Sequence, residues 1–141
     1  GDETAFLFEP DGALLAVARS PGLSAAQLCR SRPPYRDWTR TSLGRYIGGP
    51  LLTKWGAHYL VGGRRMLDRQ DPARTVLYWL VDDRLEEVAV LPSGGDNSYP
   101  GFVQLDDRRG LLSYYSSHEG SGNSRPPAAI YLTELALSTT S

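Results

Sequence analysis

The stretches DGALLAVAR at Asp11–Arg19, GAHYLVGGR at Gly56–Arg64 and GLLSYYSSH at Gly110–His118 share one layout. Each has a turn glycine at or next to its start, continues as a short apolar segment and ends on polar or charged residues. The turn glycines stand at positions 12, 56 and 110, so they are 44 and 54 residues apart. This spacing indicates an internal repeat whose unit holds several β-strands.

The rest of the chain follows the same pattern of short apolar runs. Gly, Pro, Asp and Ser separate these runs about every eight to twelve residues, which is typical of an all-β protein. No segment keeps a helical period over about eleven residues, and only Ser24–Arg30 comes near one. The pattern predicts strands over Thr4–Phe8, Ala13–Arg19, Ala26–Ser31, Thr39–Leu43, Leu51–Thr53, His58–Gly63, Arg74–Leu80, Leu85–Val90, Phe102–Leu105, Gly110–Ser116 and Ala128–Leu135.

Repeat length and strand number together are typical of a β-propeller, whose blades of about four antiparallel strands surround a channel. The predicted strands fall into groups of four, four and three, so we expect three blades over residues 1–47, 48–92 and 93–141. Three blades are half of a six-bladed ring and leave apolar faces and a strand edge open. Three arrangements remain open: a part of a longer protein, two copies that close one ring, or a compact three-sheet structure that is no propeller.

Composition excludes several function classes. The chain has 141 residues, of which 40% are hydrophobic and 22% charged, so we expect one packed domain rather than disorder. The longest apolar run falls well short of the ~20 residues of a membrane span. A net charge of −1 gives no broad attraction to nucleic acid or anionic membranes. Lys54 is the only lysine, and the resulting arginine bias suits carboxylate recognition, although genome composition produces the same bias.

Cysteine and histidine give no metal or cofactor motif. Cys29 is alone, which excludes an intrachain disulfide and favours a small buried thiol over a nucleophile. His58 and His118 lie far apart, and no metalloprotease spacing, phosphate loop or dinucleotide fingerprint occurs. We therefore expect no metal ion and no cofactor.

The first repeat places two charged side chains near each other. If Phe8 and Ala13 flank the first turn of an antiparallel hairpin, their position numbers add to 21. On this register Glu3 faces Ala18 and lies one position from Arg19.

The other two repeats end in a similar way. Arg64 ends the matching strand of the second repeat, with Gly49-Pro50 opposite. In the third repeat, the register predicted from the turn places Tyr99 opposite Ser117, beside His118. In a propeller this end of the hairpins lines one mouth of the channel.

These residue types have a specific chemistry in combination. Two arginines can hold a carboxylate through bidentate, charge-assisted hydrogen bonds. A tyrosine, with a pKa of ~10, becomes a nucleophile only if a neighbouring base such as a glutamate takes its proton. A neutral tyrosine also avoids the repulsion that a carboxylate nucleophile would suffer from an anionic substrate.

Several stretches together resemble one known family. Beside Glu3, Arg19 and Arg64, they are PPYRDW at Pro33–Trp38, GGP at Gly48–Pro50, LPSGGDNSYPG at Leu91–Gly101, SYYSSHEG at Ser113–Gly120 and IYL at Ile130–Leu132. Over nearly its whole length the chain resembles the C-terminal half of the sialidase-like, BNR-repeat six-bladed propellers.

The resemblance implies a retaining exo-glycosidase that removes a terminal acidic sugar. Tyr99 would be its nucleophile, Glu3 the base, and Arg19 and Arg64 two of its three carboxylate-binding arginines. The family's first arginine and its aspartate general acid belong to earlier blades, and nothing in this chain matches them. The stretch Ser31–Thr39 is at best a degenerate Asp-box.

Other interpretations of the same residues stay open. Without a general acid the chain can be a non-catalytic module that binds an acidic glycan or a protein, or a fragment that kept only the fold. The arginines can be salt-bridged, Glu3 can be an edge charge and Tyr99 a packing aromatic. Asp96 and His118 are expected near the predicted mouth, either as ligand-binding groups or as a turn aspartate and a surface histidine. The resemblance favours a secreted or periplasmic location, and the lone cysteine fits either side of the membrane.

Overall fold

The computed structural model describes residues 2–119 and 126–138. These residues form eleven strands in three antiparallel sheets of four, four and three strands, with no helix among them. Within this part of the chain, no helix is therefore long and apolar enough to span a bilayer. Residues 120–125 and 139–141 of the third predicted blade, including the last glycine of SYYSSHEG, lie outside the described residues.

Each sheet takes its strands in chain order, and neighbouring strands are hydrogen-bonded. Sheet A holds β1 (Thr4–Phe8), β2 (Leu14–Ala18), β3 (Gln27–Ser31) and β4 (Trp38–Ser42). Sheet B holds β5 (Gly48–Trp55), β6 (His58–Arg65), β7 (Arg74–Val81) and β8 (Arg84–Val90). Sheet C holds β9 (Asn97–Gln104), β10 (Arg109–Ser116) and β11 (Ala129–Ala136).

The all-β prediction is confirmed, and a strand forms at each of the eleven predicted places. The largest differences are at β5 and β9, which begin at Gly48 and Asn97 rather than at Leu51 and Phe102. The Gly- and Pro-containing residues before the predicted starts read as turns in the sequence. In the structure they are strand residues that contain bulges, and these accommodate Gly and Pro.

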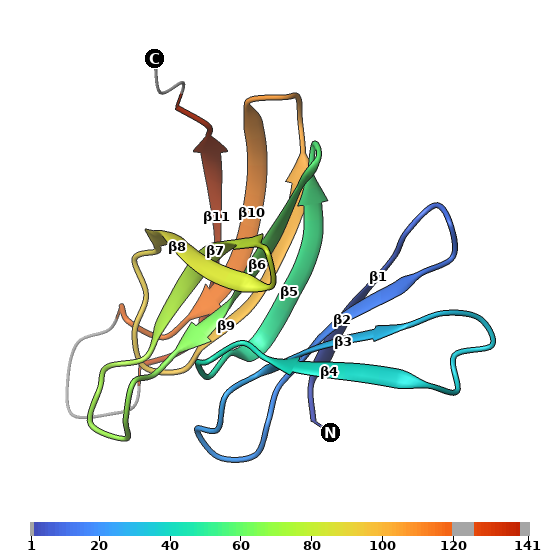
Figure 1. Cartoon of the computed structure of the whole chain (residues 1–141). Coiled ribbons are helices and arrows are strands. Elements are labelled where there is room, and N and C mark those ends of the chain that lie inside the picture. The colour runs from blue at the N-terminus through green and yellow to red at the C-terminus, as the bar shows by residue number, and fades with distance from the viewer. Residues whose placement is uncertain (1, 120–125, 139–141) are drawn as a thin grey trace.

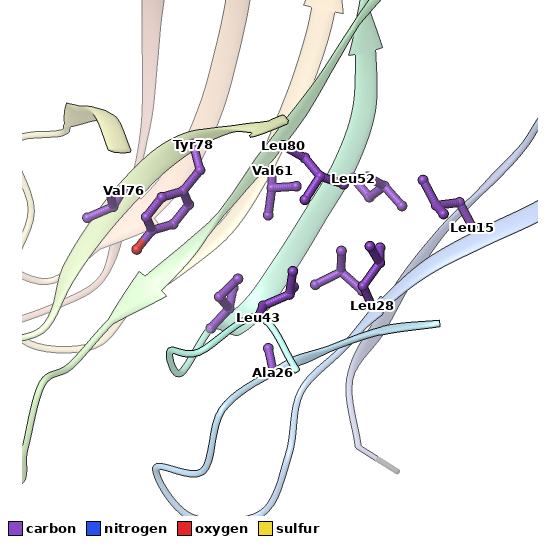
Figure 2. Close-up of a cluster of buried hydrophobic side chains, with 11 residues drawn as sticks. Leu15, Ala26, Leu28, Leu43, Leu52, Val61, Val76, Tyr78 and Leu80 are labelled. Carbon is purple, nitrogen blue, oxygen red and sulfur yellow. The ribbon is translucent and has the colours of Figure 1, made fainter. Parts of the chain in front are cut away.

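The three sheets pack face to face in the order A, B, C (Figure 1). Strand β7 shows why sheet B lies in the middle, because its apolar residues alternate between two cores. Val76, Tyr78 and Leu80 belong to the core shared with sheet A, and Leu77 belongs to the core shared with sheet C. Figure 2 shows the first core, in which side chains of sheets A and B meet.

The outer faces of sheets A and C carry exposed apolar side chains. In β1, Leu7 packs against the A–B core, so alternation sends Phe6 and Phe8 to the other face, where both are exposed. In β11, Ile130 and Leu132 are exposed on the face away from the B–C core. Such surfaces are typical of sheets that have a further packing partner.

Burial decides one single-residue prediction. Cys29 is a buried free thiol, as expected. Trp55 is also buried and belongs to the B–C core.

The register predicted for the first hairpin is wrong by one residue. The Glu9 N–H donates to the Ala13 carbonyl at 2.7 Å, so the turn has three residues rather than four. Glu3 therefore faces Arg19 instead of Ala18, and the Arg19 N–H donates to the Glu3 carbonyl at 2.9 Å. The correction brings the two charged residues directly opposite each other.

The placement of Tyr99 opposite Ser117 is also wrong. The turn between β9 and β10 is two residues shorter than predicted, because the Leu105 N–H donates to the Arg109 carbonyl at 2.9 Å. The pairing then shifts by one further residue between Ser113 and Tyr115, where Tyr99 and Pro100 form a bulge. Tyr99 has a φ of +49°, which is uncommon for a residue with a side chain. A bulge re-aims the side chain at its position, and here it displaces Tyr99 from the regular alternation of the strand.

A second bulge corrects the prediction for Arg64. Its partner on β5 is Gly48, and Gly49-Pro50 bulges out beside that pair. Gly49 has a φ of +53°, and a Cβ there would lie 2.5 Å from Ser98 Oγ. Ser98 Oγ in turn donates to the Gly48 carbonyl at 2.5 Å and accepts from the Arg64 N–H at 3.1 Å. These contacts bring the starts of β5 and β9 together.

Candidate functional site

The carboxylate of Glu3 is the point at which all three sheets meet. Its Oε2 accepts hydrogen bonds from Arg19 Nη1 at 2.8 Å and from the Gly49 N–H at 3.0 Å. Its Oε1 accepts a hydrogen bond from the Tyr99 hydroxyl. Because Gly49 belongs to β5 and Tyr99 to β9, one side chain at the start of sheet A joins the starts of sheets B and C.

Tyr46, just before β5, connects the two arginines. Its buried hydroxyl accepts hydrogen bonds from Arg64 Nε at 3.3 Å and from Arg64 Nη2 at 3.1 Å. The guanidinium carbon of Arg19 lies 5.4 Å from the centroid of the Tyr46 ring, within the range of a cation–π contact. A side chain at Gly48 would collide with the Tyr46 hydroxyl, so glycine at position 48 leaves room for this contact.

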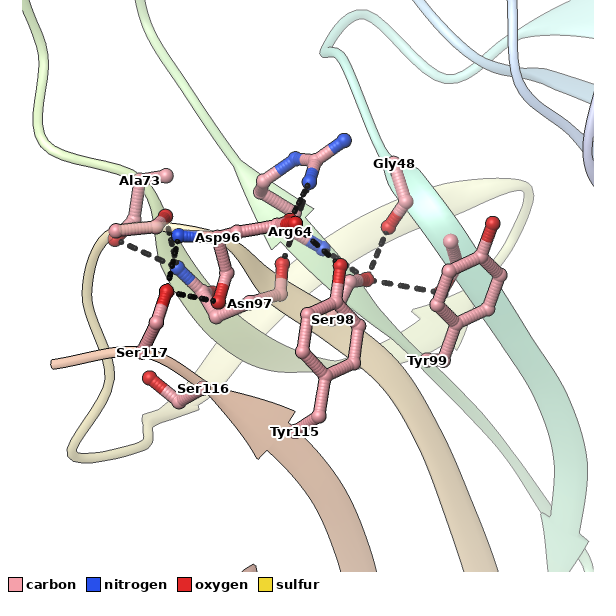
Figure 3. A network of polar contacts seen from close by, with 12 residues as sticks. Gly48, Arg64, Ala73, Asp96, Asn97, Ser98, Tyr99, Tyr115, Ser116 and Ser117 are labelled. Carbon is pink, nitrogen blue, oxygen red and sulfur yellow. Dashed lines mark hydrogen bonds and ion pairs between the residues drawn. The ribbon is translucent and has the colours of Figure 1, made fainter. Parts of the chain in front are cut away.

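Asp96 and Tyr115 complete the arrangement on the side of sheet C (Figure 3). Arg64 Nη1 lies 3.2 Å from Asp96 Oδ1, which also accepts a hydrogen bond from the Tyr115 hydroxyl at 2.6 Å. The rings of Tyr115 and Tyr99 stack at 5.9 Å between centroids with 26° between their planes.

Together these contacts form a closed circuit, which we name the polar ring. Each member touches the next, and the last touches the first; the members in order are Glu3, Arg19, Tyr46, Arg64, Asp96, Tyr115 and Tyr99. The polar ring contains two cationic and two carboxylate side chains, so its formal charges balance.

Proton positions in the resting polar ring follow from its hydrogen bonds. Burial acts to raise the pKa of Glu3, but the hydrogen bonds from Tyr99, Arg19 and the Gly49 N–H outweigh it and lower the pKa to about 2. The bond to Glu3 raises the pKa of Tyr99. Burial, together with the bond to Asp96, raises the pKa of Tyr115 to about 12. Glu3 is therefore ionised at neutral pH, and Tyr99 keeps its proton and donates a hydrogen bond to Glu3.

The structure brings five of the six predicted site residues together and leaves the sixth outside the polar ring. Glu3, Arg19, Arg64, Tyr99 and Asp96 all belong to the polar ring. His118 does not, because its Nδ1 lies 2.7 Å from Ser116 Oγ and its ring packs on Tyr131 at 4.8 Å.

Neither Tyr46 nor Tyr115 was among the predicted site residues. Tyr46 lies two residues before the GGP motif, but nothing in the sequence indicates that its hydroxyl faces Arg64. Tyr115 follows Tyr114 in a strand, so alternation does predict that the two face opposite ways. The missing information was which of the two faces meets Asp96.

A second cluster, which we name the distal cluster, lies at the other end of β1 and consists of Glu9, Lys54 and Tyr59. Glu9 accepts hydrogen bonds from Lys54 Nζ at 2.6 Å and from the Tyr59 hydroxyl. A cleft of about 710 Å³ between sheets A and B opens beside it and is also lined by Arg30 and Asp83, which form an ion pair at 2.5 Å. Among residues 2–119 and 126–138, no group of three or more His, Cys, Asp or Glu side chains is arranged to hold a metal ion.

Comparison with known proteins gives a likeness in fold. No family model matches the chain, and no curated protein matches it in sequence. A crystal structure of a protein of unknown function from Dyadobacter fermentans DSM 18053 is similar, with a TM-score of 0.74 and 24% sequence identity. The match covers 96% of this chain but only 38% of that protein. The chain is thus similar, as an all-β arrangement of three antiparallel sheets, to one part of a larger protein.

Proposed function

We propose that the polar ring binds the carboxylate of a terminal acidic sugar and that Tyr99 and Glu3 act on this sugar as nucleophile and base. The observation that carries the proposal is the carboxylate of Glu3, which contacts the Tyr99 hydroxyl and the Arg19 guanidinium at once. A base in contact with a potential nucleophile, and oriented by a third group, is the arrangement that activates weak nucleophiles.

The proposed architecture is half of a sialidase-like six-bladed propeller, with blades over residues 1–47, 48–92 and 93–141. Sheets stacked in chain order, with their first strands β1, β5 and β9 side by side, support it. The exposed apolar outer faces of sheets A and C also support it, because a ring would cover them. The remaining blades come from further segments of the same polypeptide or from a second copy of the chain.

Arginine suits the binding step. A guanidinium offers a planar fork of donors that matches a carboxylate and stays charged at every working pH. The Tyr46 hydroxyl accepts hydrogen bonds from two nitrogens of Arg64, and the Tyr46 ring lies against Arg19, so both guanidinium groups are fixed before a ligand arrives. Groups that are already ordered lose less conformational entropy on binding.

The proposed reaction is a double displacement with retention. Tyr99 Oη attacks the anomeric carbon, its proton passes to Glu3, and the bond to the leaving oxygen breaks as a general acid protonates that oxygen. Water then attacks the same carbon and gives a proton to that acid, now a base, while the Tyr99–sugar bond breaks and Glu3 returns its proton to Tyr99. Because Tyr99 is the stronger holder of the proton at rest, the transfer accompanies bond formation. A tyrosine nucleophile is the known sialidase exception among glycosidases.

Trapping of a covalent intermediate tests this proposal. The protein, with every segment or copy it naturally carries, is incubated with a fluorinated acidic-sugar substrate that slows the second step, and is then analysed by peptide mass spectrometry. We expect the sugar on Tyr99 and nowhere else. An adduct on another residue, or turnover that survives Tyr99→Phe, would overturn the nucleophile assignment.

A non-catalytic binding module is the second candidate. It is favoured by the raised pKa of Tyr99, because a hydroxyl that keeps its proton is a weak nucleophile. Calorimetry combined with product analysis separates the two: binding without release of sugar supports the module, and release supports the enzyme.

A further inference from the structure

Arg64 has two kinds of partner. Tyr46, which is 5% exposed, holds the Nε and Nη2 atoms of Arg64 from the protein side. Asp96, whose side chain is 43% exposed, contacts the Nη1 atom through one oxygen at 3.2 Å. Nη1 also donates to the Asn97 carbonyl at 3.5 Å. The buried partner fixes where the guanidinium lies, and the more exposed carboxylate pairs with Nη1.

The contact with Asp96 has the form of a weak and replaceable ion pair. It uses one oxygen and one nitrogen, without the parallel pair of bonds that makes arginine–carboxylate contacts strong. The Asp96 side of the pair is open to water and salt, which screen the ion pair and lower its contribution. Asp96 Oδ1 also accepts from Tyr115 at 2.6 Å, so this oxygen keeps a hydrogen bond if Arg64 turns to another anion.

We infer that Asp96 is an internal carboxylate that occupies Arg64 until the carboxylate of a ligand displaces it. The inference rests on the proposed function, because it assumes a ligand that brings a carboxylate to the polar ring. Asp96 then sets a threshold: neutral sugars cannot replace it, and a weakly bound anion must compete with it. Asp96 is thus a specificity-determining residue at this site.

The test compares Asp96→Asn with wild type and with Asp83→Asn. Asp83 is a matched control, because its side chain is also 43% exposed, it also pairs with an arginine, and its substitution changes the net charge equally. Each protein is titrated with a free acidic monosaccharide, and separately with acetate, in low-chloride buffer. Calorimetry gives the affinity, and the side-chain NMR signal of Arg64 Nε–H shows whether the ligand binds at Arg64.

We expect Asp96→Asn to bind the acidic sugar about three- to tenfold more tightly than wild type, because a competing and repelling charge is gone. Asp83→Asn should bind like wild type. An unchanged or lower affinity of Asp96→Asn would overturn the inference while leaving the proposed function standing, since Asp96 would then be neutral or a ligand contact.

Titration with acetate distinguishes a failure of the inference about Asp96 from a failure of the proposed function. If no protein binds the sugar but acetate binds Asp96→Asn more tightly at Arg64, the inference holds and the proposed function fails. If neither ligand distinguishes Asp96→Asn from wild type, the inference is overturned. Asp96→Ser serves as a second variant, and thermal unfolding of both variants checks that the fold is intact.

Discussion

At each end of strand β1 a glutamate accepts hydrogen bonds from a tyrosine and from a cationic side chain. Glu3 in the polar ring binds Tyr99 and Arg19, and Glu9 in the distal cluster binds Tyr59 and Lys54. In both clusters the bond to glutamate raises the pKa of the tyrosine. The local chemistry of the two ends is therefore nearly the same.

The surroundings of the two clusters differ. Glu3 also accepts from the Gly49 N–H and joins three sheets, whereas the distal cluster joins only sheets A and B. Tyr99 lies in a bulge at φ +49° and is 55% exposed, while Tyr59 sits in the regular ladder of β6. A second arginine lies within the polar ring, and the cation beside Tyr59 is a lysine 5.2 Å from its ring centroid. A glutamate–tyrosine–cation triad is thus no site by itself; strain, exposure and a second arginine distinguish the polar ring.

The largest expected difference between the ends is in catalysis. Tyr99→Phe should lower hydrolysis of an acidic-sugar substrate by at least about 10³-fold, because the nucleophile is lost. Tyr59→Phe removes the equivalent hydroxyl from the distal cluster and should leave the rate unchanged. Steady-state kinetics of both variants checks this, and equal rate losses would show that the two clusters matter only for folding.

Two glycines, Gly49 near the start of β5 and Gly56 directly after its end, allow the two ends to be compared by the free energy of unfolding. Gly49→Ala should lower the free energy of unfolding by about 2–4 kcal/mol, because φ is +53° and the new Cβ would lie 2.5 Å from Ser98 Oγ. Gly56→Ala should cost only about 1 kcal/mol, since φ is +61° but no atom lies within 4 Å. Urea unfolding measures both. Equal losses would mean that the close approach of β5 to β9 is not tight.

Two adjacent arginines test the binding role. Arg64→Lys should weaken binding of an acidic sugar about 10-fold or more, because lysine lacks the planar fork whose Nε and Nη2 bond to Tyr46 while Nη1 contacts a carboxylate. Arg65→Lys is the control, since Arg65 pairs with Glu87 at 2.8 Å outside the polar ring. Calorimetric titration compares them, and a matching loss in Arg65→Lys would argue for a general charge effect.

The last expected difference is in the pH dependence of stability. The pKa of Glu3 is about 2 in the folded protein, against 4.5 for the free side chain, so its stabilisation is complete above pH 4.5. It is lost as the pH falls from 4.5 towards 2, because the unfolded chain takes up the proton first. Glu3→Gln should flatten the unfolding free energy over this range. Glu9→Gln should flatten it less, because the pKa of Glu9 is lowered by hydrogen bonds from Lys54 and Tyr59, whereas Glu3 has a third donor in the Gly49 N–H. Acid-dependent urea unfolding of the three proteins measures this, and equal slopes in all three would contradict it.

Alternation and turn residues were enough to predict every strand, because each buried strand has a partner face that its apolar residues must cover. Strand β7 is the clearest case, with apolar residues that serve two cores. The pairing registers of the strands were harder to predict than the strands themselves. The turn after Glu9 is one residue shorter than predicted, and the turn between β9 and β10 is two residues shorter. The bulges at Gly49-Pro50 and Tyr99 each shift the pairing by one further position. No periodicity signals such a shift.

The polar ring was predictable in part for the same reason. Glu3, Arg19, Arg64 and Tyr99 were expected at one end of three hairpins, and a shift of one residue does not move a side chain to the other end. Tyr46 was not predictable, because it lies in a connection between sheets whose path depends on tertiary packing. For His118, position in the chain was a poor guide, since its contacts lie with Ser116 and Tyr131.

One calorimetric comparison tests the central claim most directly. The protein, with its natural complement of segments or copies, is titrated with acidic monosaccharides and with their methyl esters, in which the carboxylate is replaced by an uncharged ester. We predict that at least one free acid binds and that its ester binds at least about tenfold more weakly, because Arg19 and Arg64 recognise the charge. Equal affinity for acid and ester, or no binding of any acid, would contradict the assignment of the polar ring as an acidic-sugar site.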